Sequence, residues 1–333
     1  MDNLTHTLTA VVMARAGAEK LAPRATLALV VAANLPEIDS VSLLGGAGAY
    51  LTQHRTWSHS LLGAALLGVA LGALFWWRLR KKHPQPNLLR NLLILGWLGT
   101  FSHSLLDWAT AYGTQLLWPF DRTWYALDWF FIVDLWVLLI LLLGIGLPAL
   151  FLLITEEIGA RKTRAGARWG AWLALAACAL LSLGRASLHA DALARLESRL
   201  YQDRSPRRVG AFPTPLSPFT WRGVADTEST YEVVDVTLVR GRNDSERVAT
   251  LYKPTDSPGL AAAQDSDAAR AFLGWARFPH AEVVPAGGGL EVRFFDLRYL
   301  DENNRPRVFL VEVQVDSRLV VQHEGIRFAW GGR

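Results

Sequence analysis

The sequence is poor in cysteine and in charged residues. Its single cysteine, Cys178, lies inside an apolar run, so the chain can form no internal disulfide and no zinc site built from several thiolates. Only 19% of the 333 residues are charged and 51% are hydrophobic, which excludes a disordered chain and favours an integral membrane protein. The net charge of +4 comes from basic clusters in loops beside apolar runs, so we interpret them as topology determinants and expect no nucleic-acid binding.

The amino terminus lacks the features of a secretory signal. Asp2 stands where a signal would carry positive charge, and no long apolar centre follows it. We therefore expect His6 to remain part of the mature protein.

Apolar runs are concentrated in the first 185 or so residues. Four of them are long and apolar enough to cross a bilayer, namely residues 60–77, 92–108, 127–154 and 169–188. Two shorter runs precede them, and these predict a short helical hairpin that enters only part of the membrane, at 4–16 and 25–35. The predicted fold is thus a membrane all-α helical bundle of four long spans plus an amino-terminal hairpin, followed by a soluble part.

Basic residues give an orientation. The loops that follow the first and third long spans are richly basic, whereas the loops on the opposite side carry little positive charge. By the positive-inside rule the basic loops face the cytoplasm. We therefore expect a multi-pass protein of a bacterial inner membrane, with these segments in the periplasm: residues 1–6, 34–59, 108–128 and everything after about 188.

The carboxy-terminal part is expected to be soluble. Residues 189–230 read as an amphipathic helix followed by a Pro-rich connector. From residue 231 short β-type runs alternate with turn residues, and one helical candidate lies at 267–277. The sequence therefore predicts three parts: a membrane-embedded domain at 1–188, a connector at 189–230, and a small extracytoplasmic α+β domain with an antiparallel sheet at 231–333.

Side chains that can bind a metal ion gather in four short motifs near the predicted outer face: LTHTL, NLPEIDS, QHRTWSHS and FSHSLLDWATAYGTQLLWPF. The metal-capable residues in them are His6, Glu37, Asp39, His54, His59, His103 and Asp107. Imidazole nitrogens and carboxylate oxygens are ordinary ligands of zinc and of harder divalent ions. The motifs therefore predict a metal site.

The spacing within these motifs supports a shared site. His103 and Asp107 are four residues apart, which places both on one face of a helix. His54 and His59 are five apart, and a loop that runs into a helix can bring them together. Pro36 interrupts the preceding short helix, so the two carboxylates after it would project from a turn.

Simpler interpretations exist for each residue. A lone His103 in an apolar span is more often a hydrogen-bonded core residue, and a carboxylate can orient a histidine without any metal. Arg55 could hold a phosphate by charge-assisted hydrogen bonds, or pair with Asp121, Asp128 or lipid headgroups. Ionisable groups in or beside spans are costly and usually functional, and all of these motifs fall on one predicted side, so a metal site is favoured.

Together the motifs resemble the YdjM-like family of inner-membrane, metal-dependent hydrolases. The matching segments are Thr5-His6 and residues 35–39, 54–60, 102–107 and 112–120. Where the family usually has glycine after His-Arg, this chain has Thr56-Trp57, which changes local backbone freedom and keeps both histidines. The resemblance implies hydrolytic chemistry at the membrane with a divalent metal, zinc above all. A more distant similarity to zinc-dependent phospholipase C enzymes suggests a phosphoester lipid.

The resulting hypothesis is a membrane-bound metal-dependent hydrolase that acts at the periplasmic face on a lipid or lipid-linked ester, with a phosphoester preferred to an acyl ester. One or two divalent ions would be bound by His6, Asp39, His54, His59, His103 and Asp107. Glu37 would be a second ligand or, as we favour, accept a proton, and Arg55 would assist catalysis. The alternatives are a non-enzymatic, metal-stabilised membrane protein whose outer domain binds a partner or senses a signal, and a transporter, for which no inverted repeat is evident.

Overall fold

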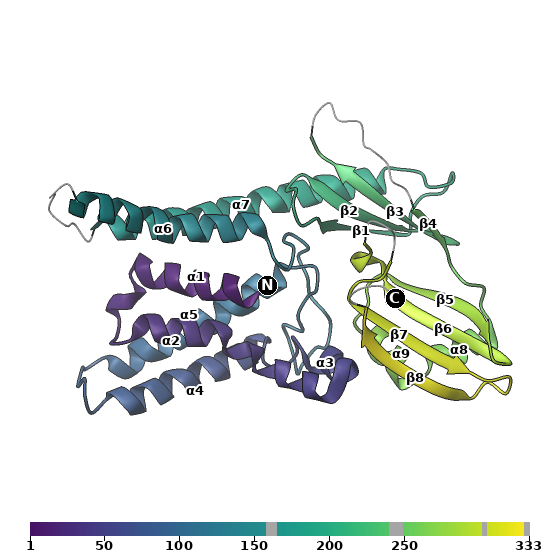
Figure 1. Ribbon diagram of the computed structural model, residues 1–333, viewed down its shortest axis with the longest axis horizontal. Coiled ribbons are helices and arrows are strands. Elements are labelled where there is room, and N and C mark those ends of the chain that lie inside the picture. The colour runs from purple at the N-terminus through teal and green to yellow at the C-terminus, as the bar shows by residue number, and fades with distance from the viewer. Residues whose placement is uncertain (158–164, 240–248, 302–304, 330–333) are drawn as a thin grey trace. The chain divides into compact units, whose positions relative to one another are not determined.

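The computed structural model describes residues 1–157, 165–239, 249–301 and 305–329 (Figure 1). The chain divides into two compact units. The first consists of Met1–Asp39 and Arg55–Ser187, and the second of Ser40–His54 and Leu188–Arg333. The first unit is helical, and the second contains the strands.

The predicted amino-terminal hairpin is confirmed. Helix α1 (Asn3–Ala16) and helix α2 (Ala25–Asn34) are joined by the short 3-10 turn η1 (Ala18–Lys20). Asp2 begins α1, because its carboxylate accepts a hydrogen bond from the backbone amide of Thr5 at 3.0 Å. A 3-10 segment, η2 (Leu35–Gly45), follows α2 at Pro36.

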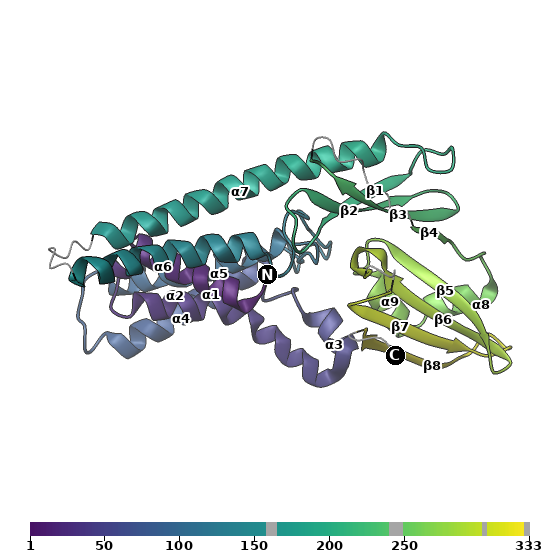
Figure 2. The ribbon, with the colours of Figure 1, turned by 45° about the horizontal axis from the view of Figure 1, so that its top comes forward.

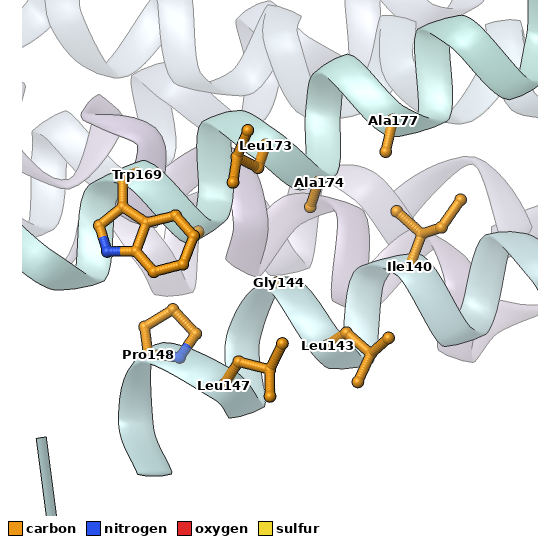
Figure 3. Close-up of a pocket in the computed structure, with 10 residues that line it drawn as sticks. Ile140, Leu143, Gly144, Leu147, Pro148, Trp169, Leu173, Ala174 and Ala177 are labelled. Carbon is orange, nitrogen blue, oxygen red and sulfur yellow. The ribbon is translucent and has the colours of Figure 1, made fainter. Parts of the chain in front are cut away.

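The remaining helices of the first unit are longer: α4 (Leu61–Leu79), α5 (Leu88–Trp108), α6 (Leu135–Glu157) and the first part of α7 (Ala165–Glu197). In Figure 2, α6 and α7 run side by side, and their backbones approach at Gly144, where a methyl group would lie 3.1 Å from the carbonyl oxygen of Gly170. An open, wholly apolar groove lies between these two helices, with Leu147 and Trp169 among its lining residues (Figure 3).

Helices α2, α4 and α5 pack through glycines. A methyl group at Gly68 of α4 would lie 3.0 Å from the carbonyl oxygen of Gly96 on α5. A methyl group at Gly99 of α5 would lie 2.9 Å from the backbone nitrogen of Ala33 on α2. Small residues thus let the backbones of these helices come close, as is common in membrane helix pairs.

Among the described residues, three helical stretches are long and apolar enough to cross a membrane: Ala25–Gln53, Leu61–Leu79 and Arg168–Glu197. The predicted count of four spans is not confirmed. Helix α5 occupies the second predicted span but is not among the three, and it carries His103 and Asp107 near its end. The third predicted span begins later than expected, because α6 begins only at Leu135 and continues to Glu157.

The second unit holds two four-stranded antiparallel sheets, where the sequence had predicted one. Both are meanders in which neighbouring strands follow each other along the chain. The first sheet comprises β1 (Arg208–Pro213), β2 (Thr220–Asp226), β3 (Thr230–Thr237) and β4 (Ala249–Tyr252), and the second β5 (Pro279–Ala286), β6 (Gly289–Asp296), β7 (Phe309–Val315) and β8 (Val321–Phe328). Strands β1 and β2 thus lie where the sequence had suggested a connector.

Three helices complete the second unit: α3 (Gly46–Gln53), α8 (Pro258–Gln264) and α9 (Asp267–Leu273). The predicted helix at 267–277 is confirmed as α9, which ends before Gly274. The end of α7 also belongs here, because Leu196 packs in one buried cluster with Trp221 and Val234 of the first sheet. The second unit therefore has its own hydrophobic cores.

Candidate metal centre

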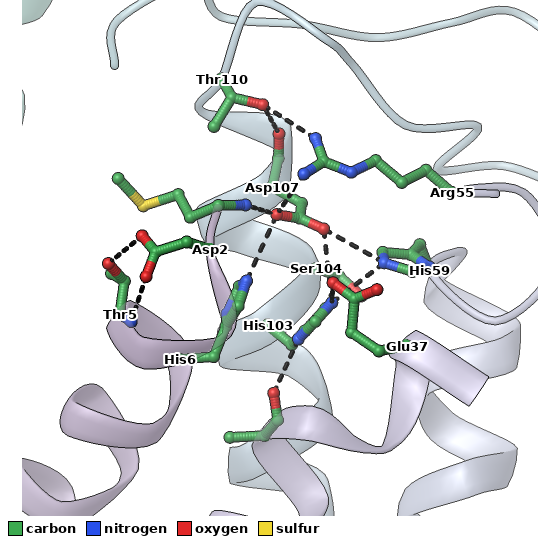
Figure 4. A network of polar contacts seen from close by, with 12 residues as sticks. Asp2, Thr5, His6, Glu37, Arg55, His59, His103, Ser104, Asp107 and Thr110 are labelled. Carbon is green, nitrogen blue, oxygen red and sulfur yellow. Dashed lines mark hydrogen bonds and ion pairs between the residues drawn. The ribbon is translucent and has the colours of Figure 1, made fainter. Parts of the chain in front are cut away.

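Five side chains from four segments of the first unit converge at one point (Figure 4). His6 comes from α1, Glu37 from the turn after α2, His59 from the turn before α4, and His103 and Asp107 from the last turns of α5. The side chains of the three histidines and of Asp107 are fully buried, and that of Glu37 is 16% exposed. Segments far apart in the sequence thus build a single polar cluster.

His103 and Asp107 lie on one face of α5, as their spacing predicted. The Nε2 atom of His103 lies 3.3 Å from Asp107 Oδ2. The other ring nitrogen, Nδ1, lies 2.7 Å from the carbonyl oxygen of Ala33 on α2. A carbonyl oxygen can only accept, so Nδ1 donates, and in the neutral ring Nε2 carries a lone pair that points into the cluster.

His59 is held in the same manner. Its Nδ1 lies 3.0 Å from Asp39 Oδ2, and its Nε2 lies 3.1 Å from Asp107 Oδ2 and 3.0 Å from His103 Nε2. If both Nδ1 atoms donate outward, two imidazole lone pairs and a carboxylate oxygen face one another. A cation between them would remove this repulsion.

His6 completes the cluster from α1. Its ring stacks on that of His103 with centroids 3.8 Å apart, and its Nε2 lies 3.4 Å from Asp107 Oδ1. In the part of the chain that the structure describes, neither ring nitrogen of His6 has a hydrogen-bond partner. Buried polar atoms normally have one, so these atoms have the character of metal ligands.

The donor set fits a divalent ion. His6, Glu37, His103 and Asp107 each offer one ligand atom, and these four atoms lie within 4.8 Å of one another. Histidine and carboxylate ligands suit zinc and several other divalent metals.

Arg55 supplies positive charge beside the cluster. Its side chain is 4% exposed, and its NH2 group lies 3.1 Å from Asp107 Oδ1. Its NH1 group donates to Thr110 Oγ1 at 3.0 Å, and the guanidinium lies over the ring of Tyr112, 4.8 Å from its centroid. The sequence had suggested Asp121, Asp128 and lipid headgroups as partners of Arg55, but not Asp107. The amino group of Met1 also lies against Asp107 Oδ1, so two cationic groups gather on this carboxylate.

The backbone of Arg55 is in the left-handed region, with φ of +60°. This conformation is unfavourable for a residue with a side chain and is found mostly where surrounding contacts enforce it. Here the Arg55 amide donates to Asp39 Oδ2 at 3.0 Å, and its carbonyl oxygen accepts from the amide of Gln115 at 3.0 Å. The turn that presents the guanidinium is therefore fixed from both sides.

Two predicted ligands, Asp39 and His54, are not among the four side chains of this donor set, and their role as ligands stays a prediction. The Oδ2 atom of Asp39 contacts Arg55, Ser58 and His59. His54 belongs to the second unit, where it is buried and its ring stacks on Tyr50 with centroids 4.4 Å apart.

Sequence reasoning missed three contributors. They are Ser58, which hydrogen-bonds Asp39; Thr110, which accepts from Arg55; and the carbonyl of Ala33, which holds His103. Ser58 and Thr110 both lie inside the quoted motifs, and this position was the signal that could have identified them. A backbone carbonyl leaves no signal in a sequence.

Comparisons with known proteins agree with the sequence motifs. A model of the family described as YdjM inner membrane protein matches residues 1–189, and a model described as YfhP C-terminal alpha/beta plait domain matches residues 258–329. A protein of Bacillus subtilis (strain 168), described as uncharacterized protein YfhP, is 23% identical over 309 residues, which cover 91% of this chain and 86% of that protein. No solved structure matches. Because the first match spans more than half of the chain and contains the whole polar cluster, the protein belongs to the YdjM inner membrane protein family.

Proposed function

We propose that the protein is a membrane-bound, metal-dependent hydrolase whose centre is this cluster. The observation that carries the proposal is the convergence of His59 Nε2, His103 Nε2 and Asp107 Oδ2 within 3.0 to 3.3 Å of one another, all fully buried. When bound there, a divalent ion supplies a Lewis acid and an acidified water molecule. One or two ions would be held, with zinc the first choice.

The chain's own residues have distinct roles in this proposal. His6, His59, His103 and Asp107 hold the ion, and His54 remains a predicted ligand. Glu37 accepts a proton, since its carboxylate is partly exposed and its Oε1 lies 3.9 Å from His103 Nε2.

Arg55 binds the anionic part of the substrate. Its Nε donor has no hydrogen-bond partner among the described residues, although the side chain is buried. A buried guanidinium with an unused donor is suited to a phosphate oxygen, which supports a phosphoester over an acyl ester. The membrane family and the apolar helices support a lipid or lipid-linked substrate. The positive-inside pattern supports a site and a carboxy-terminal domain at the periplasmic face of the inner membrane.

Metal analysis beside a hydrolysis assay tests this proposal. Purified protein is compared with His103→Ala and Asp107→Ala for bound metal and for turnover of lipid phosphoesters and acyl esters. His83→Ala, which removes an exposed histidine outside the cluster, serves as the control. We expect wild type and the control to bind metal and cleave a phosphoester, and the two cluster variants to lose both. Wild-type protein without metal would overturn the proposal.

A structural metal is the second candidate. Structural zinc sites are closed to solvent, and four of the five cluster side chains are fully buried. In this case the domain after α7 would bind a partner or sense a signal. Full metal occupancy with no turnover of any lipid would favour this reading.

A further inference from the structure

Asp39 lies beside the cluster and contacts one of its histidines. Its side chain is fully buried, and the residue follows Pro36 in the segment η2. We propose that Asp39 is a positioning residue that orients His59 toward the ion held by the cluster, and that it is not itself a ligand of that ion. This inference rests on the metal centre proposed above.

One oxygen of Asp39 gathers three donors from a single turn. Its Oδ2 accepts from Ser58 Oγ at 2.6 Å and from the Arg55 amide at 3.0 Å, and it lies 3.0 Å from His59 Nδ1. A carboxylate oxygen has about two lone-pair directions, so three donors leave this atom no capacity for a metal ion.

The contact determines how His59 presents its ring. Nδ1 also lies 2.9 Å from Ser58 Oγ, which itself donates to Asp39. Whether Nδ1 donates to the carboxylate or to this hydroxyl, the proton stays on the outer side and the Nε2 lone pair faces His103 and Asp107, at 3.0 and 3.1 Å. A negatively charged acceptor also makes the imidazole a stronger donor to a metal. His103 is oriented in the same way by the carbonyl oxygen of Ala33, 2.7 Å from its Nδ1.

The same carboxylate also fixes the neighbouring cation. By accepting from the Arg55 amide, Asp39 stabilises the left-handed turn whose side chain reaches Asp107. Asp39 thus orders a metal-binding imidazole and the adjacent guanidinium without touching the ion.

The test is Asp39→Asn in the full-length, detergent-purified protein. Asparagine keeps an acceptor oxygen of similar shape and removes the charge. Asp134→Asn is the matched control, because Asp134 is also a buried carboxylate, which caps α6 and lies 3.0 Å from Arg185. Zinc affinity is measured by competition with a chromophoric chelator, and X-ray absorption counts the ligand atoms around the bound zinc.

We expect Asp39→Asn to bind zinc about 10 to 100 times more weakly with an unchanged number of ligands. Asp134→Asn should keep the wild-type affinity. Ser58→Ala, which removes one donor to Asp39, should weaken binding in the same direction by a smaller factor, and it carries the test if Asp39→Asn does not fold.

Two results would overturn the inference while leaving the metal centre standing. One is the loss of an oxygen ligand in Asp39→Asn, which would make Asp39 a ligand. The other is wild-type affinity in both Asp39→Asn and Ser58→Ala. Absence of zinc from the wild-type protein would instead remove the proposed function, and this inference with it.

Discussion

Replacing Asp107 by asparagine is predicted to destabilise the protein even when no metal is bound. Its carboxylate is fully buried and faces Arg55 NH2 at 3.1 Å, with His59 Nε2 at the same distance from its other oxygen. Asparagine has nearly the same shape but carries no charge. The variant therefore leaves the guanidinium of Arg55 buried without a counter-charge.

The expected size of this effect follows from the burial of both partners. Removing one member of a buried ion pair costs about 3–5 kcal/mol, because the remaining charge keeps its full desolvation penalty. For a unit of roughly 150–250 residues, about 1 kcal/mol lowers the melting temperature by about 2–4 °C. Asp107→Asn should therefore melt about 6–20 °C below wild type.

Thermal unfolding of detergent-purified protein in excess EDTA provides the assay, followed by near-ultraviolet circular dichroism. Combining Asp107→Asn with Arg55→Met removes the unpaired cation, so the double variant should melt above the single one. The exposed pair of Asp267 and Arg270 provides a control, since Asp267→Asn should change the free energy of unfolding by about 1 kcal/mol or less. Equal melting temperatures of wild type and Asp107→Asn in EDTA would refute the reasoning.

Three other predictions follow from packing, burial and topology. Gly99→Ala should lower both the melting temperature and the zinc affinity, because its methyl group would meet the backbone at Ala33, whose carbonyl orients His103. Gly146→Ala is the control in the same melting and chelator assays. It should be neutral or stabilising, because the space around Gly146 is open. Burial lowers the pKa of His280 to about 4, below its ordinary 6.5, so the unfolded chain binds the extra proton. The free energy of unfolding, measured with urea, should therefore be highest above pH 6.5 and fall by about 2 kcal/mol toward pH 4, after allowance for solvent screening. His280→Leu should abolish this pH dependence. A reporter fused after Arg333 should signal a periplasmic location and one in the basic loop after α4 a cytoplasmic one; the reverse result would contradict the orientation.

The helices that bear the site were predictable because their signals are local. The two short apolar runs at the amino terminus gave α1 and α2, and the four-residue spacing of His103 and Asp107 gave their shared face on α5. Pro36 correctly marked the end of α2. In each case the information lies within one or two helical turns.

The contacts of Asp39 with Arg55, Ser58 and His59 were not predictable from the sequence. They depend on the path of a turn that lies sixteen to twenty residues further along the chain. That path requires a left-handed conformation at Arg55, which nothing in the residue type indicates. The late start of α6 has a similar cause. The preceding segment is tied to the end of α5, where the amide of Leu127 donates to the carbonyl of Trp108 and that of Phe130 to the carbonyl of Ala109.

The first sheet was underestimated because its opening strands look like a linker. Strand β1 ends at a proline and both β1 and β2 contain a glycine, and these residues normally argue against strands. Their burial explains the exception. A side chain at Gly223 would collide with Leu196 of α7, and one at Gly210 would meet the ring of Phe278, so glycine is required by close packing.

The charges of the cluster favour a bound cation over a purely structural hydrogen-bond network. In and beside the cluster, Glu37, Asp39 and Asp107 bring three carboxylates, whereas Arg55 brings a guanidinium and Met1 an amino group. A network selected for stability alone would pair donors with acceptors, because unmatched buried charge is costly. Here the net side-chain charge is negative, and two imidazole nitrogens face each other at 3.0 Å with their protons directed elsewhere. A divalent ion would satisfy both features at once, because it brings positive charge and accepts both imidazole lone pairs, whereas a proton on one imidazole would occupy only one of them.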